Sequence, residues 1–260
     1  MSYCELNERS NRLAHVFRVV GLRWGDTIAV LLENNVSFFP IVWAAQRAGL
    51  TYACLSSALS PGDVVFIVRD SGSKVVIVSG ETAPLLERAK PELAGLRCFQ
   101  IGGATSGNED LDAAAAHAPA TPIADEASGN DMLYSSGTTG RPKGVRRPIA
   151  PNTPIDQAPP IATIAAKAYG LGCDTVYLSP APLYHAGPLR WAMAVQRLGG
   201  TVVVMDKFDA EGALGLIERY QVTAAQRRKP PATSMGGPRS AMWAGSMKRD
   251  ICTLPTANIS

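Results

Sequence analysis

The chain has 260 residues, which is enough for a large hydrophobic core in one domain or two. Apolar residues make up 46% of the sequence and charged residues 18%, a globular composition that excludes a disordered chain. The net charge is +3, but the basic excess lies in residues 222–260, where six basic side chains face only Asp250. These residues are not interleaved with aromatic ones on a single element, so no nucleic-acid binding is expected.

The cysteines and the apolar runs exclude further classes of protein. Five scattered cysteines contain no Cys-x-x-Cys pair, which argues against a disulfide framework or a zinc site and favours a reducing cytoplasm. The charged residues 1–12 are unlike a signal peptide. The longest apolar run, residues 36–45, contains Pro40 and is half the length of about 20 residues that a membrane helix needs, so no transmembrane segment is expected.

Helices and strands alternate through the first half of the chain. Ser2 and Glu5 have the spacing of a capping box, and Gly21 ends the helical pattern that follows. Ser60 before Pro61 is a second well-marked helix start. The pattern predicts helices over residues 2–20, 36–49, 60–71 and 83–93, and strands over residues 27–32, 51–55 and 74–78.

The alternation resumes after a predicted loop at residues 102–130. Further strands are predicted at 131–135, 174–179, 201–205 and from 222, with helices at 187–199 and 209–220. Helical crossovers between strands give parallel pairing, so we expect an α/β fold with largely parallel sheets flanked by helices.

No periodicity continues beyond Ala225. We therefore expect a domain over residues 1–223 and an irregular or disordered tail over residues 224–260. The tail is either a disordered extension or, as we favour, the product of a reading frame interrupted near residue 224.

The sequence YSSGTTGRPKGV, residues 134–145, follows a predicted strand and carries the chemistry of a phosphate site. Its glycines let successive backbone N–H groups turn inward around an anion. Serine and threonine hydroxyls add donors, and Lys143 adds a positive charge. A Walker loop is excluded, because Pro142 stands where its second glycine belongs and Gly144 follows the lysine. A kinase or GTPase is therefore a poor interpretation.

This loop resembles the phosphate-binding signature of the adenylate-forming (AMP-binding) enzymes. Residues 31–49, 60–78 and 176–211 resemble other blocks of that family, so the similarity covers residues 2–223 and is greatest to the fatty-acyl-CoA synthetase branch. One departure is CLSS at residues 54–57, where relatives usually carry Pro-Leu-Asn.

The resemblance implies a two-step ligase that acts on a fatty or other carboxylic acid. ATP, with Mg²⁺, first converts the carboxylate to an acyl-adenylate and releases pyrophosphate; the thiol of coenzyme A then takes the acyl group. The loop is expected to hold the β- and γ-phosphates of ATP. The residues that the resemblance assigns to this role are Ser135, Ser136, Gly137, Thr138, Thr139, Gly140 and Lys143.

The resemblance also implies an acyl pocket near the sequence PLYHAGP. His185 is expected to orient the carboxylate beside the adenylate, and Gly187 to begin the helix that walls the pocket. Trp191 is a candidate for the pocket lining, with core packing as the equal alternative. We interpret His15 and His117 as structural, Arg146 with Arg147 as a solvated surface pair, and no residue as a certain catalytic or metal-binding one.

Several family blocks are not found in residues 224–260. These are the Tyr-Gly-x-Thr-Glu block, the ribose-binding aspartate, and the C-terminal lid domain with its lysine. We therefore expect a truncated fatty-acid–CoA ligase that is inactive alone. The alternative is a non-catalytic nucleotide- or partner-binding module. An interrupted frame predicts that another frame after codon 224 encodes Tyr-Gly-x-Thr-Glu; its absence from every frame would contradict this origin.

Overall fold

The computed structural model describes residues 1–104, 107–135, 142–226 and 251–253. The chain divides into two compact units. The first comprises Met1–Gln157 together with the short segment Leu183–His185, and the second comprises the described residues of Ala158–Pro182 and Ala186–Ser260.

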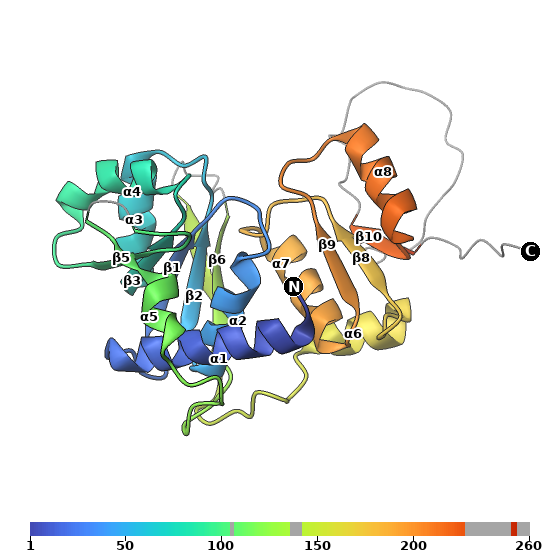
Figure 1. Ribbon diagram of the computed structural model, residues 1–260, viewed down its shortest axis with the longest axis horizontal. Helices are drawn as coiled ribbons and strands as arrows, with labels where there is room; N and C mark the ends of the chain where they lie inside the picture. Colours follow the sequence, from blue (N-terminus) through green and yellow to red (C-terminus); the bar gives the residue numbers. More distant parts are fainter. Residues whose placement is uncertain (105–106, 136–141, 227–250, 254–260) are drawn as a thin grey trace, which may run out of the picture. The chain divides into compact units, whose positions relative to one another are not determined.

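The first unit contains a seven-stranded sheet with the strand order β5-β4-β3-β1-β2-β6-β7 (Figure 1). All neighbouring strands are parallel except β6 and β7, which form an antiparallel pair. The predicted parallel α/β fold is therefore confirmed. The strands are β1 (Thr27–Leu31), β2 (Thr51–Leu55), β3 (Ser73–Val78), β4 (Arg97–Gln100), β5 (Glu109–Asp110), β6 (Asn130–Ser135) and β7 (Lys143–Arg146).

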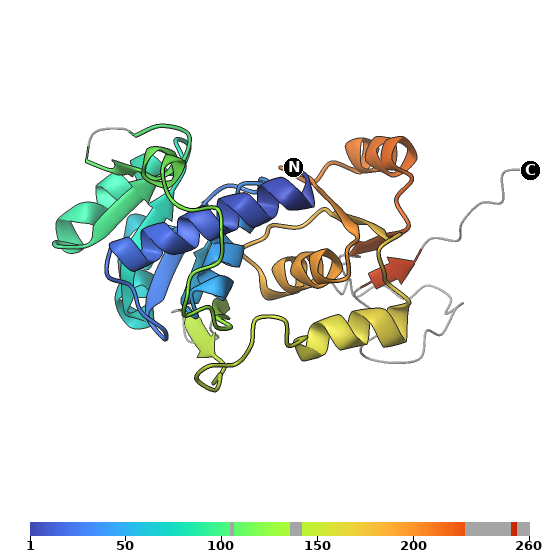
Figure 2. The ribbon, with the colours of Figure 1, turned by 60° about the horizontal axis from the view of Figure 1, so that its bottom comes forward.

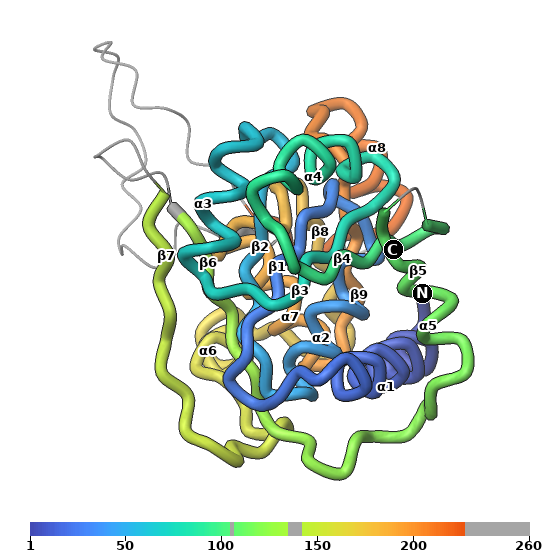
Figure 3. Tube along the Cα trace, turned by 90° about the vertical axis from the view of Figure 1, so that its left-hand side faces the viewer, coloured from blue at the N-terminus to red at the C-terminus, as the bar shows by residue number. Residues whose placement is uncertain are grey.

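Helices cover both faces of this sheet, with α3 and α4 on one face and α1, α2 and α5 on the other (Figure 3). Every residue of β1 and β2 is buried, as expected for strands between two helical layers. The helices are α1 (Tyr3–Val19), α2 (Phe38–Arg47), α3 (Pro61–Ser71), α4 (Ala83–Ala89) with the 3₁₀ turn η1 (Lys90–Glu92), and α5 (Leu111–Ala116).

The predicted helix caps are present. The Ser2 hydroxyl accepts from the backbone N–H of Glu5, and the Glu5 carboxylate accepts from that of Ser2, which completes the capping box of α1. The Ser60 hydroxyl likewise accepts from Asp63 N–H at 3.1 Å. Gly72 ends α3 at φ +67°, a left-handed conformation that favours glycine.

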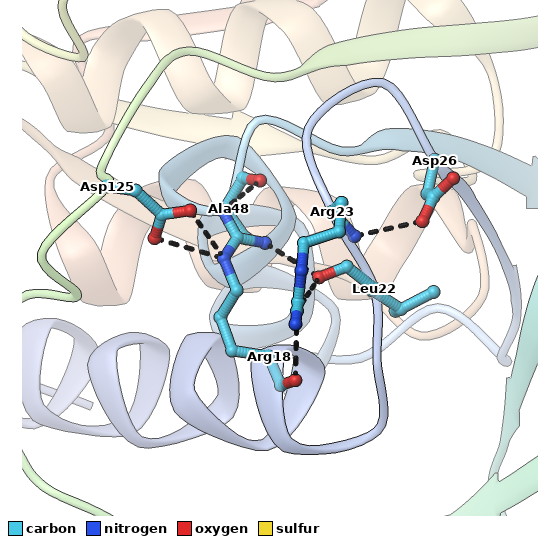
Figure 4. Close-up of polar contacts among 6 residues, drawn as sticks. All are labelled: Arg18, Leu22, Arg23, Asp26, Ala48 and Asp125. Carbon is cyan, nitrogen blue, oxygen red and sulfur yellow. Dashed lines mark hydrogen bonds and ion pairs between the residues drawn. The ribbon is translucent and has the colours of Figure 1, made fainter.

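Arg18, near the end of α1, links that helix to two distant segments (Figure 4). Its Nε donates to both carboxylate oxygens of Asp125 at 3.0 Å. Its two terminal nitrogens donate to the carbonyls of Ala48, at 2.9 Å, and Leu22, at 3.2 Å. One guanidinium therefore satisfies the carbonyl beyond the end of α2 and fixes the segment that leads to β6.

The second unit is a smaller sheet in the order β11-β10-β8-β9, with α8 on one face and α7 and α6 on the other (Figure 2). Leu178 and Met205 pack with Ala213 of α8, while the buried Tyr177 lies on the opposite face of β8 by strand alternation. The elements are α6 (Pro160–Tyr169), β8 (Val176–Ser179), α7 (Ala186–Arg197), β9 (Thr201–Val204), α8 (Ala210–Tyr220), β10 (Ala224–Gln226) and β11 (Ile251–Thr253).

The sequence pattern did not predict every helix. The expected loop over residues 102–130 contains α5, which begins where the Asp110 side chain accepts from Ala113 N–H at 2.9 Å. Helix α6 was also not predicted, although Pro160 begins it and Gly170 ends it at φ +66°. Both helices are rich in alanine, which favours a helix but marks no apolar face.

Residues 224–260, predicted as an irregular or disordered tail, are described in part. Strand β10 pairs in parallel with β8, and β11 pairs with β10 in antiparallel orientation. These two strands are regular structure within the predicted tail. The prediction of disorder for residues 227–250 and 254–260 lies outside the described residues.

Candidate functional site

The carboxyl ends of β1, β2, β3 and β6 meet at one edge of the first sheet, because these strands are mutually parallel. Ligands of open α/β sheets bind at this edge, where the strand order reverses. Here β2 lies on one side of β1 and β3 on the other, so the reversal falls beside β1. The candidate phosphate loop leaves the same edge, directly after β6.

The phosphate loop connects the two strands of an antiparallel hairpin. Ser135, the last residue of β6, pairs directly with Lys143, the first residue of β7. The hairpin therefore brings these two predicted site residues together at the base of the loop, and Lys143 is exposed there. The other predicted phosphate-binding residues, Ser136, Gly137, Thr138, Thr139 and Gly140, and the side chain of Ser135 lie outside the described residues.

Tyr134 fixes the strand that enters the loop. Its hydroxyl donates to the Asp70 carboxylate of α3 at 2.6 Å. Partial burial and this carboxylate raise the pKa of Tyr134 well above its ordinary value, so it stays a protonated donor at neutral pH. Sequence reasoning missed Asp70, because no local pattern indicates a contact between residues this far apart.

Gly144 is the second feature that sequence reasoning missed. It pairs with Tyr134 across the hairpin, and a Cβ atom there would lie 2.6 Å from Met132 Cε and 2.7 Å from Tyr134 Cζ. A larger residue would have to displace the tyrosine ring. The glycine after the lysine was a visible signal, which we used only to exclude a Walker loop.

Arg146 and Arg147 are both exposed, as expected for a surface pair, but they differ in their contacts. Arg146 donates to the hydroxyl of Thr27 on β1 at 2.6 Å, and Thr27 is buried. Arg147 is exposed, and its carbonyl accepts from the Asn130 side chain at 2.8 Å. Arg146 is therefore exposed but also hydrogen-bonded to β1, whereas the exposed Arg147 side chain forms no such bond with the described residues.

His185 belongs to the short segment Leu183–His185 of the first unit. The backbone N–H of Leu183 donates to Asn34 Oδ1 at 2.8 Å, and the Leu183 side chain is buried. The His185 ring lies 4.3 Å from the Tyr184 ring, between centroids. His185 reaches the surface, yet the surrounding protein removes enough water from the ring to lower its pKa. The imidazole is therefore neutral at pH 7.

Gly187 and Trp191 lie on α7 in the second unit. Trp191 is buried and makes an edge-to-face contact with Tyr169 of α6, with ring centroids 5.1 Å apart and planes at 83°. This contact is core packing between two helices. A Cβ atom at Gly187 would lie 2.8 Å from Gln226 Nε2, so the start of α7 closely approaches β10. Roles for Gly187 and Trp191 in an acyl pocket stay predictions.

The described residues contain neither a metal-binding cluster nor a membrane-spanning helix. No three histidine, cysteine or carboxylate side chains among them converge on a point that a metal ion could occupy. In the same residues, no helix is long and apolar enough to cross a membrane.

The sequence profile of a family of AMP-binding enzymes matches residues 1–226. The match covers most of the chain, so this chain belongs to the AMP-binding enzyme family. The resemblance predicted from the loop and its neighbouring blocks is therefore confirmed.

Individual relatives agree with this assignment. The long-chain-fatty-acid–CoA ligase FadD13 of Mycobacterium tuberculosis is 33% identical over 231 residues, which cover 85% of this chain and 43% of the relative. The inhibitor-bound N-terminal domain of FACL13, also from Mycobacterium tuberculosis, is 28% identical with a TM-score of 0.70, covering 85% of this chain and 54% of that one. ATP-bound MatB from Rhodopseudomonas palustris is 28% identical with a TM-score of 0.68, covering 84% and 42%. The chain thus spans less than half the length of FadD13.

Proposed function

We propose that this chain carries the pyrophosphate-handling part of an ATP-dependent fatty-acid–CoA ligase. The observation that supports this most is the β6–β7 hairpin, which pairs Ser135 with Lys143 at the base of the loop, in a chain that belongs to the AMP-binding family. The substrate class, a fatty or other carboxylic acid, follows from the similarity to FadD13 and is part of the proposal.

The proposed chemistry overcomes the low reactivity of a carboxylate towards nucleophiles. The carboxylate oxygen attacks the α-phosphorus of ATP, an acyl-adenylate forms, and pyrophosphate leaves. The thiol of coenzyme A then displaces AMP and gives the acyl-CoA. Backbone N–H groups of the loop and the Lys143 ammonium are proposed to bind the β- and γ-phosphates and to stabilise the charge that develops as pyrophosphate departs.

Mg²⁺ is the metal expected with ATP. Bound with ATP, it would be held in large part by phosphate oxygens and water. When bound, Mg²⁺ would neutralise charge on the phosphates. We propose that the Ser135 hydroxyl and the Lys143 ammonium bind the phosphates alongside the metal ion. No step of the reaction is assigned to a protein carboxylate.

His185 is proposed to orient the reacting carboxylate. Its lowered pKa keeps the ring neutral, so one ring nitrogen donates a hydrogen bond while the other accepts one. A neutral donor can hold a carboxylate or acyl-adenylate oxygen without forming a tight ion pair with the substrate. This role rests on the family resemblance and on the partly shielded position of the ring.

We further propose that the 260-residue chain alone binds nucleotide but turns over little, because its sequence contains no Tyr-Gly-x-Thr-Glu block after residue 223. The test is fatty-acid-dependent exchange of labelled pyrophosphate into ATP by the purified chain. Exchange at the background rate, with saturable ATP binding, is the expected result. Robust exchange would contradict the lack of turnover, and no binding at millimolar ATP would contradict the phosphate role.

A non-catalytic module is the second candidate. It rests on the same β6–β7 hairpin, because a loop presented in this way can bind an anion without turnover. The ligase and a nucleotide-binding module both require the loop to bind an anion, but only the ligase predicts that added fatty acid changes the affinity for ATP. A titration of ATP with and without saturating fatty acid separates them.

A further inference from the structure

The turn after β1 is held rigidly on both sides of Asn34. On one side, the Glu33 carboxylate accepts from the Ser79 hydroxyl, just beyond β3, and from the Asn35 side-chain amide. On the other side, Asn35 Oδ1 accepts from Ser37 N–H at 2.8 Å, at the start of α2. The turn lies at the carboxyl ends of the strands, beside the reversal of strand order.

Ser79 is itself fixed, so the partner of Glu33 does not move freely. Its backbone N–H donates to Thr82 Oγ1 at 3.0 Å, and the Thr82 hydroxyl donates to the Leu31 carbonyl at 2.6 Å. Ser79 and Thr82 are both buried. This closed set of hydrogen bonds ties the segment after β3 to the last residue of β1 and so constrains the backbone that carries Asn34.

The Asn34 side chain contacts a segment that lies 149 residues away in the sequence. Its Oδ1 accepts the backbone N–H of Leu183 at 2.8 Å. Leu183 is 1% exposed, so its N–H has little access to water as an alternative partner. Only Tyr184 separates Leu183 from His185, and the Tyr184 and His185 rings are in contact.

We propose that Asn34 is a positioning residue for His185, acting through the backbone N–H of Leu183. The side-chain amide is suited to this task because its oxygen is a fixed, uncharged acceptor. A carboxylate there would hold the same N–H but would place a negative charge near the substrate carboxylate that His185 is proposed to orient. This inference rests on the proposed function only for the role of His185, and its structural step can be measured without nucleotide.

The first experiment measures hydrogen exchange of the Leu183 amide and the imidazole NMR signals in the full chain. The chain has three histidines, so His15 and His117 are internal references for His185. In Asn34→Ala, the exchange rate of the Leu183 amide relative to global opening should rise about tenfold or more, since its acceptor is gone. The His185 signals should shift while those of His15 and His117 stay.

Three further variants serve as controls for this experiment. Asn34→Asp keeps an acceptor at the same position and should restore the protection of Leu183. Asn34→Gln displaces the oxygen by one methylene and should behave like Asn34→Ala, which covers the case in which the alanine variant does not fold. Asn130→Ala removes an asparagine of the same unit whose side-chain amide donates to the Arg147 carbonyl, and it should leave the relative protection of Leu183 unchanged.

The inference would be overturned if Leu183 exchange in both Asn34→Ala and Asn34→Gln stayed within twofold of the unaltered chain. It would also be overturned if Asn34→Asp and Asn34→Gln gave the same His185 signals. Failure of the proposed function would give a different result. The chain would not bind ATP, but the Leu183 amide would keep its normal protection, so the contact between Asn34 and Leu183 would still stand.

Discussion

The Tyr134 hydroxyl donates to the Asp70 carboxylate at 2.6 Å and so ties β6 to α3 immediately before the phosphate loop. The loop's entry is thus fixed by a contact with the helix that covers the sheet, and its exit is fixed by strand pairing between Ser135 and Lys143. An anion site made of backbone N–H groups depends on such fixed ends, because their dipoles must already point inward when the phosphate arrives.

Loss of the tyrosine hydroxyl should weaken the first unit. We expect Tyr134→Phe to lower the free energy of unfolding by about 0.5–1.5 kcal/mol, since the half-buried tyrosine loses its hydrogen bond to the exposed Asp70 carboxylate. Urea unfolding measures this. In the double variant with Asp70→Asn, the two effects should be less than additive. Full additivity would show that the two side chains do not interact.

The same contact predicts a loss of stability at high pH. The pKa of Tyr134 is raised in the folded chain, so its stabilising contribution is complete below its ordinary value of 10.0 and is lost as pH rises toward the raised pKa. Unfolding measured above pH 10 should therefore show a steeper loss for the unaltered chain than for Tyr134→Phe. Equal slopes would contradict this assignment.

Gly144→Ala tests the close packing at the base of the loop. The new methyl group would lie less than 3 Å from the Tyr134 ring and from Met132, so the ring must move. We expect a cost of about 1–3 kcal/mol in stability and weaker ATP binding. Gly80→Ala is the matched control, because a Cβ atom there has no neighbour within 4 Å. Equal stability of the two variants would argue against the packing described.

Arg18 offers a test of how α1 is held. Arg18→Lys should cost about 1–3 kcal/mol, because one ammonium cannot replace a guanidinium that binds Asp125 and two carbonyls together. Asp125→Asn should cost less than about 1 kcal/mol, because the Asp125 side chain is 61% exposed. Thermal unfolding compares them. A larger effect of Asp125→Asn would mean that the ion pair, not the carbonyl contacts, holds the helix.

His185 should titrate below its ordinary value of 6.5, because partial burial disfavours the charged ring. Between the lowered pKa and 6.5 the unfolded chain binds a proton that the folded chain does not, so stability falls as pH drops through this range. NMR titration of the three imidazoles gives the midpoint for His185 directly. A midpoint at or above 6.5 would contradict the shielding of the ring.

The fold was largely predictable because its signals are local. The capping residues Ser2 and Ser60 mark helix starts, and the largely apolar strands β1 and β2 mark a sheet buried on both faces. Helix α5 and strand β7 were missed, since an alanine-rich helix has no apolar face and a strand with exposed residues has no apolar alternation. Short elements of this kind are specified by their neighbours more than by their own residues.

The candidate site was predictable only where a single motif contains it. The phosphate loop is contiguous, so its composition and its resemblance could be read directly from residues 134–145. The contacts that position the site join distant residues: Tyr134 with Asp70, and Asn34 with Leu183. No period or spacing in one sequence reveals such pairs, because they arise from the order of strands in the sheet.

The central claim is that the loop ending at Lys143 binds the phosphates of ATP, and equilibrium binding of ATP and pyrophosphate to the purified chain tests it most directly. The account predicts saturable binding that weakens about tenfold or more in Lys143→Ala, since a charged donor to phosphate is removed. Arg147→Ala, which removes a nearby exposed cation, should change the affinity by less than about twofold. Absence of binding at millimolar nucleotide, or equal weakening by the two variants, would contradict the claim.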